Sequence, residues 1–305
     1  MSFPERARTA LVTGGGRGLG RAHALALAAN GIHVVVNDTG AELDGSGASA
    51  APANDVVAEI KSGGGTAVAS TADISTYAGA VAAVATAVDA FGSVDAVVSN
   101  AGILRDRSFG KMTAAEFDAV VQTHLAGGAY VVRAAWDELR GSGSGRVVFT
   151  TSATGLYGQF GQANYGAAKA GLVGLMNVLK VEGERAGICV NTIAPVARSR
   201  MTQSLLPPDA LDGVGPERVS PVVCYLASAE CTETGLILAV GGGLLSRVQI
   251  CESAPVEMRA DSSVHAVHDL VQDLLKEPTS DGFPHVPAAT YRILVAGGHV
   301  GPQPG

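Results

Sequence analysis

The chain has 305 residues, of which 47 % are hydrophobic, and its 28 acidic and 21 basic residues give a net charge of −7. This acidic balance argues against nucleic acid as the main partner, because phosphate binding needs a concentrated basic face. The sequence near Met1 has no secretory hydrophobic segment, and a run of about eighteen apolar residues is absent, so neither export nor a membrane span is supported. We therefore expect a cytoplasmic protein.

Metal binding is not expected. The cysteines form no C-x-x-C pair, which predicts reduced thiols, most of them buried: Cys189, Cys224, Cys231 and Cys251. His265 and His268 could share one face of a helix as ligands. Since no third ligand lies nearby in the sequence, an exposed amphipathic helix is the favoured interpretation.

Apolar runs alternate with helical stretches along the first 245 residues. The runs are Thr9–Thr13, Ile32–Val36, Thr66–Ser70, Val94–Ser99, Arg146–Thr151, Ile188–Ile193 and Leu236–Val240. This alternation predicts one α/β domain over residues 1–245, with a doubly wound parallel sheet of about seven strands and helices on both faces. The longest predicted helices are Thr113–Arg140 and Ala163–Ala186.

A glycine-rich turn joins the first predicted strand to a helix that ends near Asn30. It reads Gly14-Gly15-Gly16-Arg17-Gly18-Leu19-Gly20, a G-x-x-x-G-x-G spacing. Small residues let the backbone approach a pyrophosphate, and the free N–H groups of the following helix stabilise its charge. A flexible turn is the alternative interpretation of the glycine cluster alone.

Asp38 follows the second predicted strand, Ile32–Val36, with Asn37 between them. A carboxylate there can accept hydrogen bonds from the ribose hydroxyls of NAD and would repel the 2′-phosphate of NADP. The sequence therefore favours NAD as the cofactor over NADP. Arg17 is the opposing signal, because it is either a solvated turn residue or a ligand for a 2′-phosphate.

Tyr165 and Lys169 are four residues apart on a predicted helix, so their side chains point to the same place. A neighbouring cation favours the phenolate form of a tyrosine. Ser152, at the end of an apolar run, adds a hydroxyl donor. The three together suit carbonyl and alcohol chemistry. The alternatives are a surface Tyr–Lys pair and a serine that merely forms a turn.

Four motifs in order resemble the short-chain dehydrogenase/reductase family over residues 7–245. They are the glycine turn, Ser99-Asn100-Ala101-Gly102, the Ser152/Tyr165/Lys169 set and Asn191-Thr192-Ile193-Ala194-Pro195. Further stretches resemble the (3R)-hydroxyacyl-CoA dehydrogenase part of peroxisomal multifunctional enzyme type 2 and its stand-alone bacterial relatives: 36–40, 41–55, 100–109, 157–165 and 199–202.

The resemblance implies a Rossmann-type oxidoreductase that interconverts a secondary alcohol and a ketone with NAD. Tyr165 would exchange the hydroxyl proton, Lys169 would lower the phenol pKa and bind the nicotinamide ribose, and Ser152 would hold the reacting oxygen. The implied cofactor-binding residues are Gly14, Arg17, Gly18, Leu19, Gly20, Asp38, Asp73, Ile74, Asn100, Ala101, Gly102, Tyr165, Lys169, Pro195 and Val196.

Two positions depart from the usual family pattern. His124 stands where many members have an asparagine that supports a proton relay through the lysine, although the multifunctional-enzyme subgroup resembles this chain there. An imidazole can pass a proton, so His124 is either a relay or support residue or a hydrogen-bonded helix histidine. Val196 replaces the usual glycine after Pro195, which leaves the local nicotinamide contacts open.

The leading functional hypothesis is NAD-dependent oxidation of a 3-hydroxyacyl-CoA, and the resemblance also permits a sterol-derived acyl group. Five basic residues could meet the CoA phosphates or be solvated loop charges: Arg105, Arg107, Lys111, Arg198 and Arg200. A hydroxysteroid or other alcohol dehydrogenase acting on a free substrate is the alternative, and a catalytically silent nucleotide-binding protein is disfavoured by the intact Ser152/Tyr165/Lys169 set. The resemblance also implies a homodimer or homotetramer.

Residues 246–305 form a C-terminal extension that is expected to pack on the domain or on a partner subunit. Ser262 is the predicted cap of a helix whose apolar residues recur at helical spacing from Val264 to Leu275, and 282–287 would end that helix. Tyr291–Val295 could add a strand, cover the substrate cleft or reach a partner.

Overall fold

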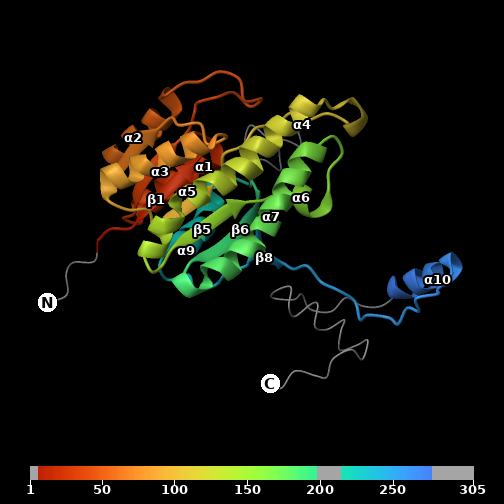
Figure 1. Ribbon diagram of the computed structural model, residues 1–305. Coiled ribbons are helices and arrows are strands. Elements are labelled where there is room, and N and C mark those ends of the chain that lie inside the picture. Colours follow the sequence, from red (N-terminus) through yellow and green to blue (C-terminus); the bar gives the residue numbers. More distant parts are fainter. Residues whose placement is uncertain (1–5, 198–213, 277–305) are drawn as a thin grey trace. The chain divides into compact units, whose positions relative to one another are not determined.

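The computed structural model describes residues 6–197 and 214–276. The chain divides into two compact units, Met1–Arg247 and Val248–Gly305. The first unit holds the sheet and its covering helices, drawn from red to cyan in Figure 1. In the second unit the described part contains one helix, α10, over Val264–Leu274.

The first unit is built on a sheet of eight strands in the order β3-β2-β1-β4-β5-β6-β7-β8. Their bounds are β1 Thr9–Thr13, β2 His33–Asn37, β3 Ala67–Ser70, β4 Ala96–Ser99, β5 Arg146–Thr150, β6 Cys189–Val196, β7 Ile237–Gly241 and β8 Leu244–Val248. The first seven pair in parallel, with Leu11 opposite Val35 on one side and Val97 on the other. The order reverses beside β1, which makes the carboxyl ends of β1 and β4 the usual place for a ligand crevice.

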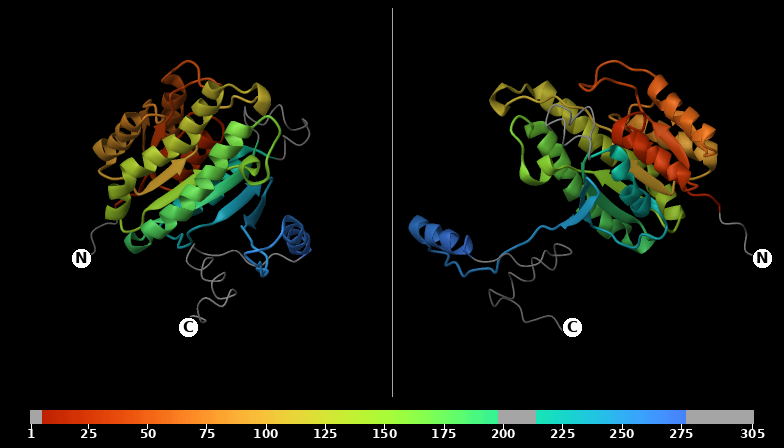
Figure 2. Two further views of the ribbon diagram at one scale, coloured as in Figure 1. Left: turned by 45° about the vertical axis from the view of Figure 1, so that its right-hand side comes forward. Right: turned by 180° about the vertical axis from the view of Figure 1, so that it is seen from behind.

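Helices cover both faces of the sheet, as the opposite views in Figures 1 and 2 show. One layer contains α1 (Gly18–Ala29), α2 (Ala51–Ser62) and α9 (Ser220–Ala227), in which α1 contacts the other two. The other contains α3 (Tyr77–Phe91), α5 (Gly127–Gly141) and α7 (Ala163–Gly183), in which α5 contacts both neighbours. The shorter elements are α4 (Ala114–Val121), α6 (Ala153–Tyr157), η1 (Phe109–Lys111), η2 (Gln122–Ala126), η3 (Glu184–Ala186) and η4 (Pro216–Arg218).

Burial on both faces explains why the strand sequences are continuously apolar. Every residue of β1, β4 and β5 is buried, and Val12, Val34 and Val98 belong to one core cluster with Leu27 of α1 and Leu226 of α9. Strands that are covered on one face only would alternate apolar and polar residues, whereas these do not. The core therefore fixes the strand ends that carry the functional side chains.

The predicted strands all exist, with ends displaced by at most two residues except at β6, which continues to Val196. The eighth strand, β8, was not predicted. Gly242 and Gly243, with φ of 57° and 80°, link it to β7, and a two-residue link joins antiparallel neighbours. Leu244 and Leu245 on β8 are 79 % and 57 % exposed, so an apolar pattern was no guide to its place at the sheet edge.

The long helix predicted over Thr113–Arg140 consists of three pieces. α4 begins with a capping box between Thr113 and Glu116, and a π-helical turn, η2, separates α4 from α5. A π-turn leaves no mark in the hydrophobic spacing, which is why the sequence suggested an unbroken helix. Such turns often lie at functional sites, and this one carries His124.

The cap of α10 was predicted one residue too early. Ser263, not Ser262, accepts the hydrogen bond from the Ala266 N–H at 3.2 Å. The predicted helix end at 282–287 and the Tyr291–Val295 strand lie outside the described residues. Of the four cysteines, which are all free, only Cys231 is buried and Cys251 is exposed, so the expectation that most are buried is wrong. Among the described helices, none is long and apolar enough to cross a bilayer.

Candidate active site

The glycine turn after β1 forms a close-packed cradle at the start of α1. Gly14 and Gly18 have φ of +63° and +51°, which favour glycine. A Cβ on Gly20 would overlap the Gly14 carbonyl oxygen, so a side chain cannot be accommodated there without a shift. The backbone can consequently come close to a ligand at the helix N-terminus, where free N–H groups favour an anion.

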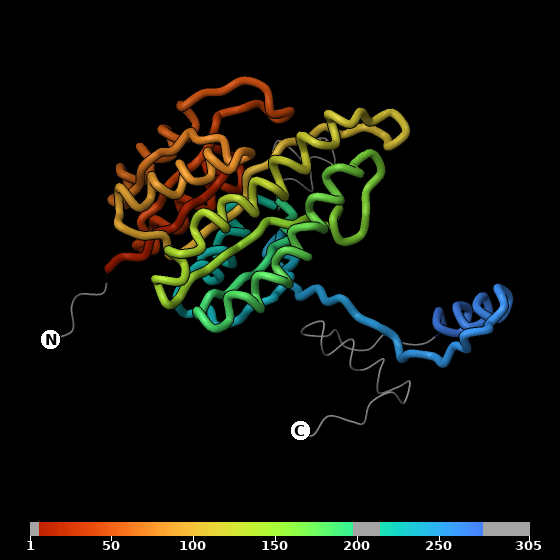
Figure 3. Tube along the Cα trace, viewed as in Figure 1, coloured from red at the N-terminus to blue at the C-terminus, as the bar shows by residue number. Residues whose placement is uncertain are grey.

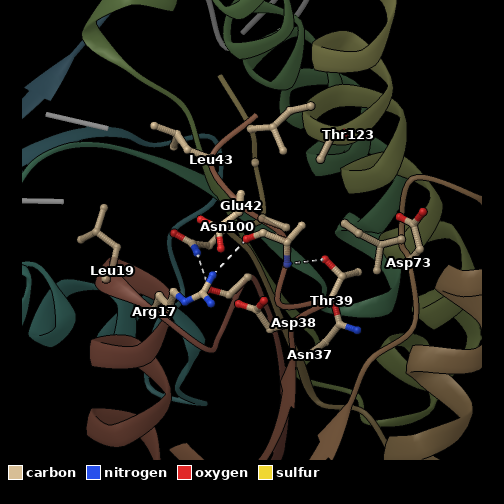
Figure 4. A pocket seen from close by; sticks show the side chains of 17 residues that line it. Arg17, Leu19, Asn37, Asp38, Thr39, Glu42, Leu43, Asp73, Asn100 and Thr123 are labelled. Atoms are coloured by element: carbon tan, nitrogen blue, oxygen red, sulfur yellow. Dashed lines mark hydrogen bonds between the residues drawn. The ribbon is translucent and has the colours of Figure 1, made fainter. Parts of the chain in front are cut away.

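A cleft lies beside this cradle, at the carboxyl ends of β1, β2 and β4 (Figure 4). It contains most of the predicted cofactor-binding residues: Gly14, Arg17, Gly18, Leu19, Asp38, Asp73, Ile74, Asn100, Ala101 and Gly102. Its other lining residues received no role from the sequence: Asn37, Thr39, Ala41, Glu42, Leu43, Ile103 and Thr123. Gly20 shapes the cradle without lining the cleft.

Asp38 is held at the cleft by two backbone donors. Its Oδ2 accepts from the Gly16 N–H at 2.8 Å, and its Oδ1 accepts from the Gly40 N–H at 2.7 Å. Arg17 lies on the same side, where its Nη1 donates to the Ala41 carbonyl oxygen at 3.0 Å. Arg17 therefore lines the cleft with its guanidinium bonded to the backbone of the β2–α2 connection.

The connection from β2 to α2 crosses to the segment after β4, and Figure 3 shows it as a long orange excursion. We call residues 41–49 the strap. The Leu104 N–H donates to the Leu43 carbonyl oxygen at 2.9 Å, and Arg105 Nε donates to the Asp44 carbonyl oxygen at 3.0 Å. The strap therefore joins the two sides of the cleft. This contact links segments that are distant in the sequence, and the sequence did not predict it.

Asn100 locks the end of β4 onto the glycine turn. Its Nδ2 donates to the carbonyl oxygens of Thr13 and Gly14, each at 3.2 Å. The hydroxyl of Thr13 accepts from the backbone N–H groups of Asn100 and Ala101 at 3.0 and 3.1 Å. These bonds satisfy buried backbone groups where two parallel strands end and so fix one wall of the cleft.

Ser152, between β5 and α6, meets Tyr165 and Lys169 of α7. Ser152 caps α6, and its Oγ accepts from the Thr154 N–H at 3.1 Å. Lys169 Nζ lies 5.5 Å from the centre of the Tyr165 ring and donates to the Thr150 carbonyl oxygen at 2.6 Å. The helical spacing thus places phenol and amine side by side as predicted.

The electrostatics of the pair differ from the sequence expectation. Complete burial lowers the pKa of Lys169 to about 7, because a charged amine is poorly solvated there. Burial raises the pKa of the Tyr165 phenol, a hydrogen bond from Ser152 opposes that rise, and the charge of Asp106 adds to it. The phenol pKa is therefore raised by burial, whereas the sequence led to the expectation that it is lowered beside Lys169.

His124 is buried between the cleft wall and Tyr165. Its Nε2 lies 3.1 Å from the Ile103 nitrogen and 2.8 Å from the Ile103 oxygen, while its buried Nδ1 has no protein partner among the described residues. The imidazole meets the Tyr165 ring edge-on, with centroids 5.2 Å apart. Burial and the nearby Lys169 charge lower its pKa well below the ordinary value, so the ring is neutral.

The remaining predicted residues lie elsewhere. Pro195 and Val196 end β6 outside the lining of the cleft, with Val196 paired to Gly241. Arg107 pairs with Glu116 through Nε and Oε1 at 2.9 Å. Arg198 and Arg200 fall outside the described residues. Within the described ranges, no three His, Cys, Asp or Glu side chains are grouped to hold a metal ion.

Comparison with known sequences identifies the family. Residues 8–208 match the short chain dehydrogenase family. A protein named as a short-chain type dehydrogenase/reductase of Mycobacterium tuberculosis is 52 % identical over 80 % of this chain and 85 % of its own. Hydroxyacyl-CoA dehydrogenase ChsB1 of the same organism is 42 % identical over 77 % of each chain. Mouse peroxisomal multifunctional enzyme type 2 is 48 % identical over 82 % of this chain, which spans only 34 % of that enzyme.

Solved structures agree. A short chain dehydrogenase from Mycobacterium avium has a TM-score of 0.79 and 41 % identity, covering 91 % of this chain and 98 % of its own. A 7α-hydroxysteroid dehydrogenase in complex with NADH and 7-oxo glycochenodeoxycholic acid has a TM-score of 0.70 and 27 % identity, covering 78 % of this chain and 94 % of its own. The chain therefore belongs to the short-chain dehydrogenase family, whose members are oxidoreductases that use nicotinamide cofactors.

Proposed function

We propose that this protein is an NAD-dependent dehydrogenase that interconverts a 3-hydroxyacyl-CoA and a 3-oxoacyl-CoA. The observation that carries the proposal is the convergence of Ser152, Tyr165 and Lys169 near a cleft lined by the glycine turn and Asp38, in a chain 42 % identical to a hydroxyacyl-CoA dehydrogenase. The similarity to part of a peroxisomal multifunctional enzyme supports the same substrate class.

The residues of the cleft fit a dinucleotide. The glycine turn and the start of α1 border the cleft with backbone N–H groups suited to phosphates, and Asp38 presents a carboxylate suited to ribose hydroxyls. That carboxylate supports NAD over NADP, since it would repel a 2′-phosphate. Asp73 and Ile74 would border the adenine, and Asn100, Ala101 and Gly102 would form the opposite wall. When bound, the nicotinamide group supplies the hydride acceptor or donor.

Tyr165 is the proposed proton acceptor in the oxidation direction. Its phenolate would take the proton of the substrate hydroxyl, so its raised pKa makes the oxidation faster as pH rises. Ser152 would donate a hydrogen bond to the same substrate oxygen, and loss of such a donor costs roughly 10²–10³ in rate. Lys169 would hold the nicotinamide ribose and supply positive charge when it is protonated.

His124 is the proposed support of this site. Its Nε2 contacts the Ile103 backbone, and its ring packs against Tyr165, so it links the cleft wall to the phenol. A neutral, buried imidazole is better suited to positioning than to carrying charge. Pro195 and Val196 remain proposed neighbours of the nicotinamide at the end of β6.

The acyl-CoA assignment predicts basic groups near the substrate. Arg105 and Arg107 are already partly engaged, by the strap and by Glu116, and Lys111 ends η1. A CoA phosphate would have to compete with those contacts or share the guanidinium groups. A homodimer or homotetramer is proposed from the family, whose equivalents of α5 and α7 pack against partner subunits.

A hydroxysteroid dehydrogenase acting on a free substrate is the second candidate, because a solved structural neighbour is a 7α-hydroxysteroid dehydrogenase. The deciding experiment follows NADH formation by absorbance with NAD or NADP. The panel contains (3R)- and (3S)-hydroxyacyl-CoA esters, their free acids and hydroxysteroids, with Tyr165→Phe as the inactive control. Turnover confined to the CoA esters with NAD supports the proposal, whereas equal turnover of free steroids would favour the second candidate.

A further inference from the structure

Gln162 lies between the two helices that carry the catalytic hydroxyls. It stands at the N-cap position of α7, three residues before Tyr165, and is only 5 % exposed. Both ends of its side-chain amide are bonded, because Oε1 accepts from the Thr154 hydroxyl at 3.0 Å and Nε2 donates to Asp106 Oδ2 at 2.7 Å. A buried amide with both ends bonded is held in one orientation.

The first bond leads to Ser152. Thr154 donates its backbone N–H to Ser152 Oγ at 3.1 Å and its hydroxyl to Gln162, so it touches both. Since α6 spans only Ala153–Tyr157, it has few intrahelical bonds of its own. The position of the Ser152 hydroxyl relative to α7 therefore depends on the contact with Gln162.

The second bond leads to the segment that follows the cofactor cleft. Around Asp106, the Arg107 N–H donates to the Gly161 carbonyl oxygen at 2.8 Å, and Asn164 Nδ2 donates to the Arg105 carbonyl oxygen at 3.0 Å. Asn164 Oδ1 also accepts from the Tyr165 N–H at 2.8 Å. Asp106 thus belongs to a seam that joins the cleft wall to the first turn of α7.

We propose that Gln162 and Asp106 are positioning residues that hold the Ser152 and Tyr165 hydroxyls where both can meet one substrate oxygen. This inference rests on the proposed function, in which those hydroxyls bind and deprotonate the substrate alcohol. Neither residue touches the reacting atoms. They act through Thr154 on one side and through the start of α7 on the other.

The Asp106 charge has a second effect. Burial is the main cause that raises the pKa of the Tyr165 phenol, and the Asp106 charge raises it further, whereas the Ser152 hydrogen bond lowers it. The other ionisable groups facing the phenol in the described structure are Lys169 on α7 and His124 on η2. Asp106 is itself exposed, so solvent screens its influence. Replacing its carboxylate should lower the phenol pKa modestly.

Three substitutions separate position from charge. Gln162→Met removes both bonds, and Asp106→Ala removes only the acceptor of Gln162. Asp106→Asn keeps an acceptor oxygen and removes the charge. Asp118→Asn, on the exposed side of α4, is the control for losing one negative charge. Because Asp106 is exposed, its variants remain informative if Gln162→Met fails to fold.

Activity is measured as kcat and KM against pH, using whichever substrate of the panel the wild type oxidises. Gln162→Met and Asp106→Ala should lower kcat roughly ten- to hundredfold with little change in KM, because a small misplacement of reacting groups is costly. Asp106→Asn should keep kcat at the optimum within about twofold and move the acid limb to lower pH. Unchanged kcat in both Gln162→Met and Asp106→Ala would overturn the positioning role.

A substrate-free measurement distinguishes failure of this inference from failure of the proposed function. The tyrosinate absorbance of wild type minus Tyr165→Phe follows the phenol alone, and Asp106→Asn should lower its midpoint whereas Asp118→Asn should not. If the CoA esters are inert but this midpoint moves and another alcohol shows the kcat losses, the substrate assignment fails and the positioning pair stands. An unmoved midpoint and an unmoved acid limb would overturn the part assigned to the Asp106 charge.

Discussion

Lys169 Nζ donates a 2.6 Å hydrogen bond to the carbonyl oxygen of Thr150, although the lysine is 3 % exposed. One carbonyl oxygen cannot replace the water around an ammonium group, so burial lowers the pKa of Lys169 to about 7. The candidate active site thus contains a lysine whose uncharged form is favoured by burial in the folded state.

The first prediction concerns the stability cost of that lysine. Its folded pKa lies below the unfolded value, so the unfolded chain binds an extra proton between about pH 7 and about pH 10.5 and stability rises with pH there. Below about pH 7 the whole penalty is present. Lys169→Met should therefore raise the free energy of unfolding by on the order of a few kcal/mol at pH 6 and by much less at pH 10, while abolishing turnover.

Urea unfolding at the two pH values measures this difference. Lys180→Met, at a more exposed position of α7, is a matched control for removing a lysine from the same helix. A Lys169→Met protein that is less stable than the wild type at pH 6 would show that the Thr150 hydrogen bond outweighs the desolvation of the amine.

The second prediction concerns the contact between Gly102 and His124. A Cβ on Gly102 would overlap the His124 ring, whose Nε2 lies 3.1 Å from the nitrogen of Ile103. Gly102→Ala should therefore displace the imidazole and the cleft wall together and weaken NADH binding about tenfold or more, a loss of about 1.4 kcal/mol. Fluorescence titration with NADH measures the affinity.

His124→Ala tests whether the clash with the imidazole causes the weaker NADH binding of Gly102→Ala. In the double variant the alanine at 102 has room, so NADH should bind more tightly than to Gly102→Ala alone, with a coupling energy of about 0.5 kcal/mol or more. Strictly additive losses would show that the two residues affect the cofactor site independently. Gly110→Ala, where a Cβ meets nothing nearby, is the control substitution.

The third prediction concerns the strap. Arg105 Nε donates to the Asp44 carbonyl oxygen, whereas Arg107 pairs with Glu116 on α4. Arg105→Ala should therefore free the strap and raise the NADH dissociation rate about fivefold, as expected for one net hydrogen bond. Arg107→Ala should leave that rate unchanged. Stopped-flow displacement of NADH without any CoA ester keeps substrate binding out of the measurement. Equal rates in the two variants would contradict the role of the Arg105–Asp44 bond in holding the strap.

The sequence was a good guide where function depends on local spacing. Tyr165 and Lys169 meet because four residues make about one helical turn, and Gly14, Asp38 and Asn100 share a cleft because parallel strands end at one edge of the sheet. These are short-range rules, and the buried strands follow from their continuous apolar runs. The eight-residue β6 and the exposed β8 show their limit at strand ends.

The parts that were missed depend on contacts between distant segments. The strap is hydrogen-bonded to Leu104 through Leu43, which is 61 residues away in the sequence, and Gln162 is hydrogen-bonded to Asp106, which is 56 residues away. No periodicity encodes such pairings. The electrostatics were missed for a similar reason, because the burial that lowers the pKa of Lys169 is a property of the packed fold and not of the helical spacing.

The last prediction concerns acid stability. His23 on α1 is fully buried, its Nδ1 lies 2.9 Å from the Ser220 hydroxyl, and burial lowers its pKa to about 3. Its folded pKa is below the unfolded value of 6.5, so the unfolded chain gains a proton first as pH falls and stability is lost between pH 6.5 and pH 3. Between pH 6.5 and pH 5 this residue alone should lower the free energy of unfolding by about 2 kcal/mol.

His23→Gln keeps a partner for Ser220 and should reduce the loss of stability by that amount in urea unfolding. His265→Gln, on the exposed face of α10, is the control. An undiminished decline in His23→Gln would assign the acid sensitivity to other groups, of which buried His124 is the first to test.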